Sequence, residues 1–169
     1  MIVYQAPENF SNKFYGKHSV FLSGGITDCH NWQRDIIDEL QSLHDSGMFN
    51  LDSMVIFNPR RDNFDMLDRD VAIEQIKWEH RRLEMCDIFS CFFIDSESVQ
   101  PITLYELGKY ATHKNSVISI VSGYKRTNDV VTQLALDRTY CSVYYEYREA
   151  IREHARKIAL SYDIIRRKP

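Results

Sequence analysis

Residues 88–108 read IFSCFFIDSESVQPITLYELG and carry the clearest fold signal in the chain. The run from 88 to 94 is apolar and has the length and composition typical of a buried strand. A polar loop follows, and a helix is predicted to begin at residues 101–103. A carboxylate lies on each side of the loop: Asp95 where the strand ends, and Glu106, which we expect in the first helical turn. Because open α/β sheets bind ligands beyond the carboxyl ends of their strands, this junction is a candidate site.

The same helix start also has a purely structural interpretation. Thr103 and Glu106 are spaced as a capping box, in which the two side chains bind free backbone N–H groups of the first turn. Capping is the commoner use of this motif, so the local pattern leaves both roles of Glu106 open.

Strand and helix patterns alternate along the rest of the chain. Short apolar runs predict strands at residues 19–23, 54–57, 87–94, 116–121 and 140–144, and amphipathic segments predict helices at residues 32–43, 70–85, 103–112, 130–136 and 150–165. Ile73, Ile76 and Leu83 are expected to face the core from the second of these helices. The alternation predicts an α/β fold, a three-layer sandwich around a five-stranded, mainly parallel sheet.

We expect residues 1–169 to form one domain, because the chain has no repeat, low-complexity tract or interdomain linker. Residues 1–17 hold only a weak strand pattern at 2–4, and they are predicted to form an arm or a lid.

Composition excludes several classes of function. The net charge of −3 argues against binding a nucleic acid polymer through a broad basic surface. No apolar run has the length of a membrane span, and the N-terminus lacks the pattern of a signal peptide. The 4 cysteines lie far apart, which suits reduced thiols better than a disulfide framework. We therefore expect a soluble, cytoplasmic protein with no membrane partner.

Motifs for cofactors and metals are missing from the sequence. There is no P-loop, no Gly-x-Gly-x-x-Gly fingerprint and no nucleophile elbow. The 6 histidines do not have the spacing of metal ligands. The sequence therefore predicts neither a cofactor nor a metal.

Small and polar residues follow two of the predicted strands at the edge where right-handed crossovers gather the strand-end loops. They are either ligand contacts or ordinary turn and loop residues: Ser23, Gly24 and Gly25 after one strand, and Asn58, Arg60 and Arg61 after the other. Gln75 and Glu79 share a helix face, with Trp78 beside them. Ordinary surface polarity explains this pair as well as a site does.

With no cofactor or metal motif in the sequence, the carboxylates are the remaining candidates for catalysis. A pair of carboxylates suits cleavage of a bond to the anomeric carbon of a sugar. Such a reaction needs a nucleophile beneath that carbon and a proton donor for the leaving group. Glu106 is placed for the nucleophile, since a first-turn position favours its ionised form. Asp95 or Glu79, in a drier setting, can hold the proton for a departing base. Trp78 can stack on a planar base.

Five motifs in consistent order and spacing resemble the nucleoside 2-deoxyribosyltransferase-like family over about residues 19–130. The closer similarity is to its branch with Asn-Pro-Arg-Arg and Thr-x-x-Glu-Leu-Gly motifs. The residues that carry the resemblance are 21–25, 31–33, 58–61, 75–79 and 101–108.

The resemblance implies a flavodoxin-like, Rossmann-like sheet of five strands and a small-molecule nucleoside or nucleotide as the substrate. It implies that Glu106 attacks C1′ of the deoxyribose, that Glu79 contributes to the base pocket, and that the protein is a homo-oligomer. The substrate-binding set is then expected to comprise Ser23, Gly24, Gly25, Trp32, Asn58, Arg60, Arg61, Gln75, Trp78 and Thr103. The acceptor is either a second base, in a transferase, or water, in a hydrolase. The alternative is a nucleotide-binding or nucleotide-sensing module without turnover.

The chain departs from well-studied transferases at two places. The loop before the nucleophile helix reads Ser-Val-Gln-Pro at residues 98–101. Well-studied transferases carry an Asp-Asp/Asp-Ser-Gly-type loop at this place. Phe21 stands where they place a tyrosine on the first strand. We expect the loop at 98–101 to help select the substrate.

Overall fold

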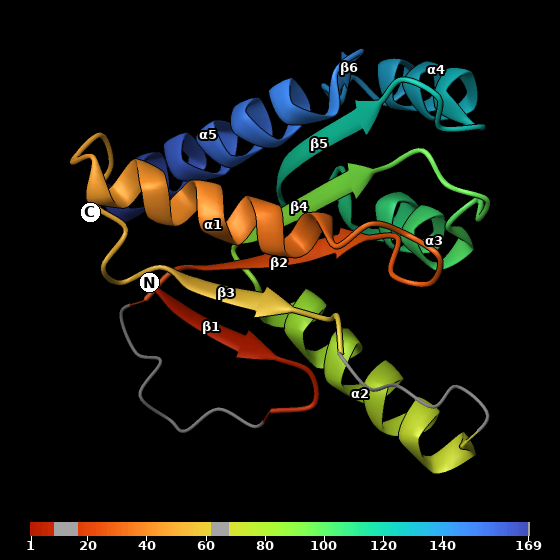
Figure 1. The fold of residues 1–169 in the computed structure, drawn as a ribbon, viewed down its shortest axis with the longest axis horizontal. Coiled ribbons are helices and arrows are strands. Elements are labelled where there is room, and N and C mark those ends of the chain that lie inside the picture. The colour runs from red at the N-terminus through yellow and green to blue at the C-terminus, as the bar shows by residue number, and fades with distance from the viewer. Residues whose placement is uncertain (9–16, 62–67, 169) are drawn as a thin grey trace.

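The computed structural model describes residues 1–8, 17–61 and 68–168, which form a six-stranded, all-parallel sheet covered by helices on both faces (Figure 1). The strands lie side by side in the order β1-β3-β2-β4-β5-β6. They are β1 (Ile2–Gln5), β2 (Ser19–Gly24), β3 (Val55–Asn58), β4 (Ile88–Phe93), β5 (Asn115–Val121) and β6 (Ser142–Tyr144). The helices are α1 (Trp32–Asp45), α2 (Arg69–Met85), α3 (Pro101–Tyr110), α4 (Thr127–Leu136) and α5 (Tyr147–Arg166).

The sheet separates two apolar cores, one under each helical layer. Side chains of α1 and α5 fill the first core, and side chains of α2, α3 and α4 fill the second. Strand β4 serves both, since Ile88 and Phe92 face the first core while Phe89, Cys91 and Phe93 face the second. Strands buried on both faces become almost continuous apolar runs, which is why the sequence shows them so clearly. The predicted three-layer, flavodoxin-like α/β fold is confirmed.

The predicted number of strands is wrong by one. The weak pattern at residues 2–4 is part of β1, which pairs in parallel with β3 from Ile2 opposite Val55 to Gln5 opposite Asn58. These residues therefore belong to the sheet edge and are not an arm or a lid. The remainder of that prediction, at residues 9–16, lies outside the described residues. A four-residue edge strand is too short for its periodicity to stand out.

Helix α3 begins at the first residue of the range predicted for its start, two residues before Thr103, and this removes the capping box. Its N-cap is Gln100 and its first residue is Pro101, which suits the first helical position because it has no N–H to leave unpaired. Thr103 and Glu106 are therefore inside the helix, and no acidic residue lies in its first turn. The capping interpretation is wrong, and so is the placement of Glu106 in the first turn.

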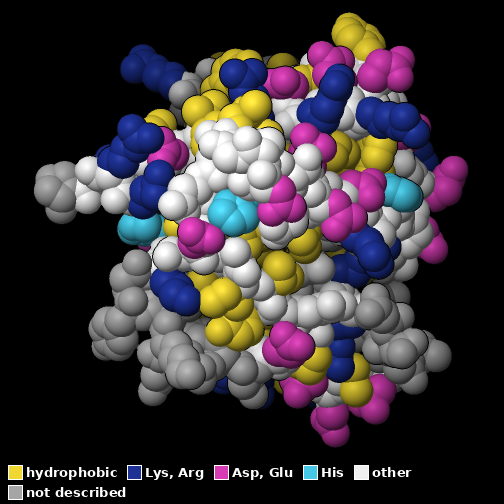
Figure 2. All heavy atoms as spheres, turned by 60° about the vertical axis from the view of Figure 1, so that its left-hand side comes forward, with side chains coloured by type: hydrophobic (Ala, Val, Ile, Leu, Met, Phe, Trp, Pro, Cys, Tyr) yellow, Lys and Arg dark blue, Asp and Glu magenta, His cyan; other side chains and the backbone are white. Residues whose placement is uncertain are grey.

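All strands point the same way, so their carboxyl ends form one rim, on the right in Figure 1. Figure 2 brings forward the opposite, left-hand side, where the described Lys, Arg, Asp and Glu side chains are interspersed and no area of one sign dominates. Within the described ranges, no helix combines the length and apolar character that a membrane crossing requires.

Candidate functional site

A cavity of about 710 Å³ opens at the carboxyl rim of the sheet, between α2 and α3. This volume is typical of pockets for small organic ligands. Its lining includes much of the site expected from the sequence: Ser23, Gly24 and Gly25 at the end of β2, Arg61 after β3, Gln75 and Glu79 on α2, and Thr103 and Glu106 on α3.

Glu106 is a buried carboxyl group in the cavity wall, with a residue exposure of only 7%. The Ser23 hydroxyl donates a hydrogen bond to Glu106 Oε2 at 2.5 Å. Burial raises the pKa of Glu106 to about 8, against the lowering effect of the Ser23 bond and with a further rise from the charge of Glu79. The expectation that a helix terminus would favour the ionised form is wrong, because the second-turn carboxyl lies beyond that influence and desolvation dominates.

Glu79 is the second carboxyl group that lines the cavity. Gln75 Nε2 donates to Glu79 Oε1 and to the carbonyl oxygen of Pro59, each at 2.7 Å, which fixes the orientation of both side chains. Burial raises the pKa of Glu79, and the hydrogen bond from Gln75 lowers it. Two carboxyl groups with raised pKa values that line one cavity and interact electrostatically are suited to acid–base chemistry.

Asp95 does not join this pair. Its residue is exposed, it is not among the residues that line the cavity, and its carboxylate lies beside Gly123 at the end of β5. A Cβ built on Gly123 would come within 2.8 Å of Asp95 Oδ2. The structure therefore pairs Glu106 with Glu79 and leaves Asp95 outside the cavity.

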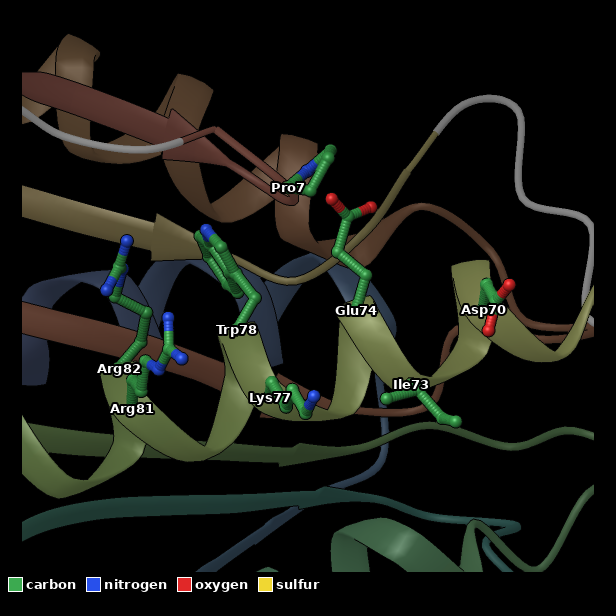
Figure 3. A pocket seen from close by; sticks show the side chains of 8 residues that line it. All are labelled: Pro7, Asp70, Ile73, Glu74, Lys77, Trp78, Arg81 and Arg82. Atoms are coloured by element: carbon green, nitrogen blue, oxygen red, sulfur yellow. The ribbon is translucent and has the colours of Figure 1, made fainter.

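Neither tryptophan of the expected set lines the large cavity. Trp32 is fully buried, stacks on Phe92 at 5.0 Å between ring centroids, and donates from Nε1 to the carbonyl oxygen of Gly25. Trp78 donates to the carbonyl oxygen of Glu8 and lines a second cavity of about 350 Å³ (Figure 3). In Figure 3 the Trp78 side chain points from α2 toward the side where Pro7 lies. Both rings pack within the protein.

The Asn-Pro-Arg segment after β3 organises a neighbouring loop. Asn58 Oδ1 accepts a hydrogen bond from the backbone N–H of Arg60 at 3.0 Å. The Arg60 guanidinium donates to four oxygens: the carbonyls of Ile26, Cys29 and His30, and Gln33 Oε1. Asn58 and Arg60 thus hold the loop between β2 and α1. Arg61 lines the cavity, and its Nη1 lies 3.5 Å from Glu74 Oε2.

Gly24 and Gly25 are needed for packing within the protein, whatever else they contact. A Cβ on Gly24 would lie 2.4 Å from Trp32 Cζ2 and 2.5 Å from the carbonyl oxygen of Phe92. A Cβ on Gly25 would lie 2.5 Å from Cys29 Sγ and 2.8 Å from Gln100 Cδ. Separations this short require the backbone or a buried side chain to move.

We expect Gly24→Ala to lower the free energy of unfolding by about 1–3 kcal/mol, the usual cost of overpacking a tight site. Gly108→Ala is the matched control, because a Cβ there meets nothing within 4 Å and the residue lies in the exposed part of α3. That change should stabilise the helix by up to about 1 kcal/mol. Urea unfolding of both variants measures the difference, and equal stability would contradict the packing argument.

Several residues at the cavity were not predicted as site residues. Ile76, expected in the core, is 63% exposed and lines the cavity mouth with Ile102 and Tyr105, so that prediction is wrong. Ile76 is next to Gln75 in the sequence, and this neighbour was the one indication that Ile76 could lie at the site. Gln100, which is buried beside Gly25, was also not predicted as a site residue. The sequence indicated it only as the polar residue that precedes the proline at the start of a helix.

Comparison with known families gives one match. A family model described as nucleoside 2-deoxyribosyltransferase like matches residues 17–124, a range that includes Ser23, Glu79 and Glu106. No curated protein matches the chain. Among the described residues, no group of three or more His, Cys, Asp or Glu side chains is arranged to hold a metal ion.

Proposed function

Because the chain belongs to the nucleoside 2-deoxyribosyltransferase-like family, we propose that it cleaves the N-glycosidic bond of a (deoxy)nucleoside or nucleoside 5′-monophosphate. Glu106 is the nucleophile in this proposal. The observation that carries it is the buried Glu106 carboxyl, fixed by Ser23 in a cavity that also holds Glu79.

The reaction needs one proton on the two carboxyl groups, held by Glu79, with Glu106 ionised. Because burial and the charge of Glu79 raise the pKa of Glu106 to about 8, this form arises when Glu106 gives its proton to Glu79. Glu79 donates its proton to the departing base while Glu106 attacks C1′, so a glycosyl–enzyme bond forms as the N-glycosidic bond breaks. Water or a second base then attacks C1′ and gives its proton to Glu79, which is now ionised, while the bond from C1′ to Glu106 breaks. Positive charge that develops on the sugar in the transition state stabilises the ionised Glu106 carboxylate in its dry setting.

Cations along α2 support an anionic substrate. Lys77 and Arg81 line the cavity, as does Arg61 after β3, while burial raises the pKa of both Glu79 and Glu106. A 5′-phosphate is the anion that a nucleotide would bring to this side. We therefore expect monophosphates to be cleaved with a higher kcat/KM than the corresponding nucleosides.

A homo-oligomer is part of the proposal. Ile76, Ile102 and Tyr105 are 63%, 64% and 68% exposed at the cavity mouth, and a second copy of the chain that covers this apolar rim would also narrow the opening. Tyr105→Arg is expected to shift the sedimentation coefficient toward the monomer, with Tyr145→Arg, an 83% exposed tyrosine elsewhere, as the control. Identical sedimentation of wild type and Tyr105→Arg would contradict this arrangement of copies.

One observation favours a second candidate function, nucleotide binding without turnover. With a pKa of about 8, Glu106 is mostly protonated at neutral pH, and a protonated carboxyl is a hydrogen-bond donor rather than a nucleophile. Such a module would recognise a ligand through Glu106 and release nothing.

Incubation with a panel of nucleosides and 5′-monophosphates, with and without a second base, separates the two functions. Chromatography should show free base for a hydrolase, or exchanged base for a transferase, and neither with Glu106→Gln. A ligand that raises the melting temperature while no base is ever released would instead establish the binding module.

A further inference from the structure

Gln100 has an unusual backbone for a residue that is not glycine. It is the N-cap of α3, yet its φ of 52° and ψ of 57° are left-handed and its side chain makes no capping bond to the helix. The left-handed region is disfavoured for a residue that carries a Cβ, so neighbouring contacts must hold Gln100 in this conformation. The Gln100 N–H donates to Ser98 Oγ at 3.0 Å, and the residue is buried, with an exposure of only 3%.

The buried amide of Gln100 joins three segments of the cavity wall. Its Oε1 accepts from the Gly25 backbone N–H at 3.0 Å. Its Nε2 donates to the carbonyl oxygen of Ile94 at 2.7 Å and lies 3.4 Å from Ser96 Oγ. The turn after β2, the end of β4 and the start of α3 are therefore tied together at one side chain. A hydrocarbon of equal length would make none of these bonds.

The Gln100–Gly25 hydrogen bond joins the start of α3 to the end of β2, and the Ser23–Glu106 hydrogen bond joins the same helix and strand. Ser23 precedes Gly25 by two residues near the end of β2, and Glu106 lies less than two helical turns after Gln100 in α3. Since a helix is rigid over that distance, the position of α3 against β2 at Gln100 also sets the separation of Ser23 and Glu106. Gly25 leaves just enough room for the amide, because a Cβ there would meet Gln100 Cδ at 2.8 Å.

We propose that Gln100 is a positioning residue, whose side-chain amide locks α3 against the end of β2 and so holds the Glu106 carboxyl on the Ser23 hydroxyl. Its consequence for turnover rests on the proposed function. Its consequence for the titration of Glu106 does not.

The test uses Gln100→Met, which keeps the length of the side chain and removes its hydrogen bonds. We expect kcat to fall about 100-fold with little change in KM, because small displacements of a reacting group cost about that much in rate. The pKa of Glu106, followed by ¹³C NMR of its carboxyl carbon, should rise, because the Ser23 bond that lowers it is weakened. Gln41→Met is the control, since it removes an exposed amide bond to Asp45 on α1.

A folded Gln100→Met protein with the wild-type kcat and the wild-type Glu106 titration overturns the proposal. Should wild type release no base from any substrate, the proposed function fails, and the titration alone still decides the role of Gln100. Should Gln100→Met not fold, hydrogen exchange in the wild type decides it. The Gly25 amide is expected to be protected by Gln100, and exchange at the rate of an open amide would overturn the proposal.

Discussion

Glu106→Gln is expected to abolish base release and, at the same time, to make the folded protein more stable at pH 8. The amide is the same size as the carboxyl and can still accept the hydrogen bond from Ser23, but it cannot attack C1′. It also removes a group that is costly to ionise in the cavity, since burial raises the pKa of Glu106 to about 8 from an ordinary value of 4.5. Activity and stability therefore change in opposite directions.

The gain in stability depends on pH in a defined way. Below about pH 4.5 the carboxyl is protonated in both the folded and the unfolded chain, and it imposes no electrostatic penalty. Between 4.5 and about 8 the unfolded chain loses the proton first, so the free energy of unfolding of the wild type falls as pH rises. Above about pH 8 the carboxyl is ionised in both states, and the loss of folding stability caused by its burial no longer changes with pH. The variant should exceed the wild type by roughly 4 kcal/mol at pH 8, because a tenfold change in an ionisation constant corresponds to about 1.4 kcal/mol.

Urea unfolding at a series of pH values measures this difference. Glu149→Gln, at an exposed position in the first turn of α5, is the control and should change stability by less than about 0.5 kcal/mol. A Glu106→Gln protein that is less stable than wild type at pH 8 would mean that the carboxyl is ionised and well compensated in the folded state.

Glu79→Gln is expected to lower kcat by about 10²–10⁴-fold, the usual contribution of a general acid. The new amide oxygen can still accept the hydrogen bond from Gln75, so the change removes the titrating proton and the charge of Glu79 while it preserves the size and orientation of the side chain. The loss should disappear for a substrate whose leaving group departs without a proton. The pKa of Glu106 should also fall, because the charge of Glu79 no longer raises it.

The pH dependence of kcat/KM is the decisive measurement for Glu79. Wild type should give a bell-shaped profile, since one proton must be lost from the pair and one retained, and Glu79→Gln should lose the limb that falls at high pH. Asp95→Asn is the comparison, because the structure places that carboxylate beside Gly123, and it should keep the wild-type profile. A Glu79→Gln protein with a wild-type profile would assign Glu79 to binding the base.

The fold could be predicted because its strands are buried on both faces and therefore strongly apolar. Strand β1 gave only a weak pattern at residues 2–4 and was left out of the predicted sheet, because four residues at an edge carry too little periodicity. The start of α3 could be predicted only to within residues 101–103, because Gln100 before it has a left-handed backbone and side-chain bonds to Gly25, far away in the sequence, and to Ile94, across the loop. Local propensity does not contain such contacts.

The cavity was predictable in its broad location and only partly in its members. The positions of Glu79 and Glu106 could be predicted because both residues lie on helices. The direction of a side chain at the end of a strand depends on the path of the loop, as Asp95 illustrates. On α2, Trp78 is one residue from Glu79 and so points about 100° away from it around the helix axis. The motif groups these residues in sequence, and helix geometry separates them in space.

Arg60 has a consequence for how relatives of this protein should be recognised. Its guanidinium binds three carbonyl oxygens of the β2–α1 loop and Gln33 Oε1 at the start of α1, a structural role that does not depend on catalysis. The Asn-Pro-Arg signature therefore traces ancestry and architecture. Under the proposed function, a genome survey for working enzymes would require both Glu79 and Glu106 in addition to this signature.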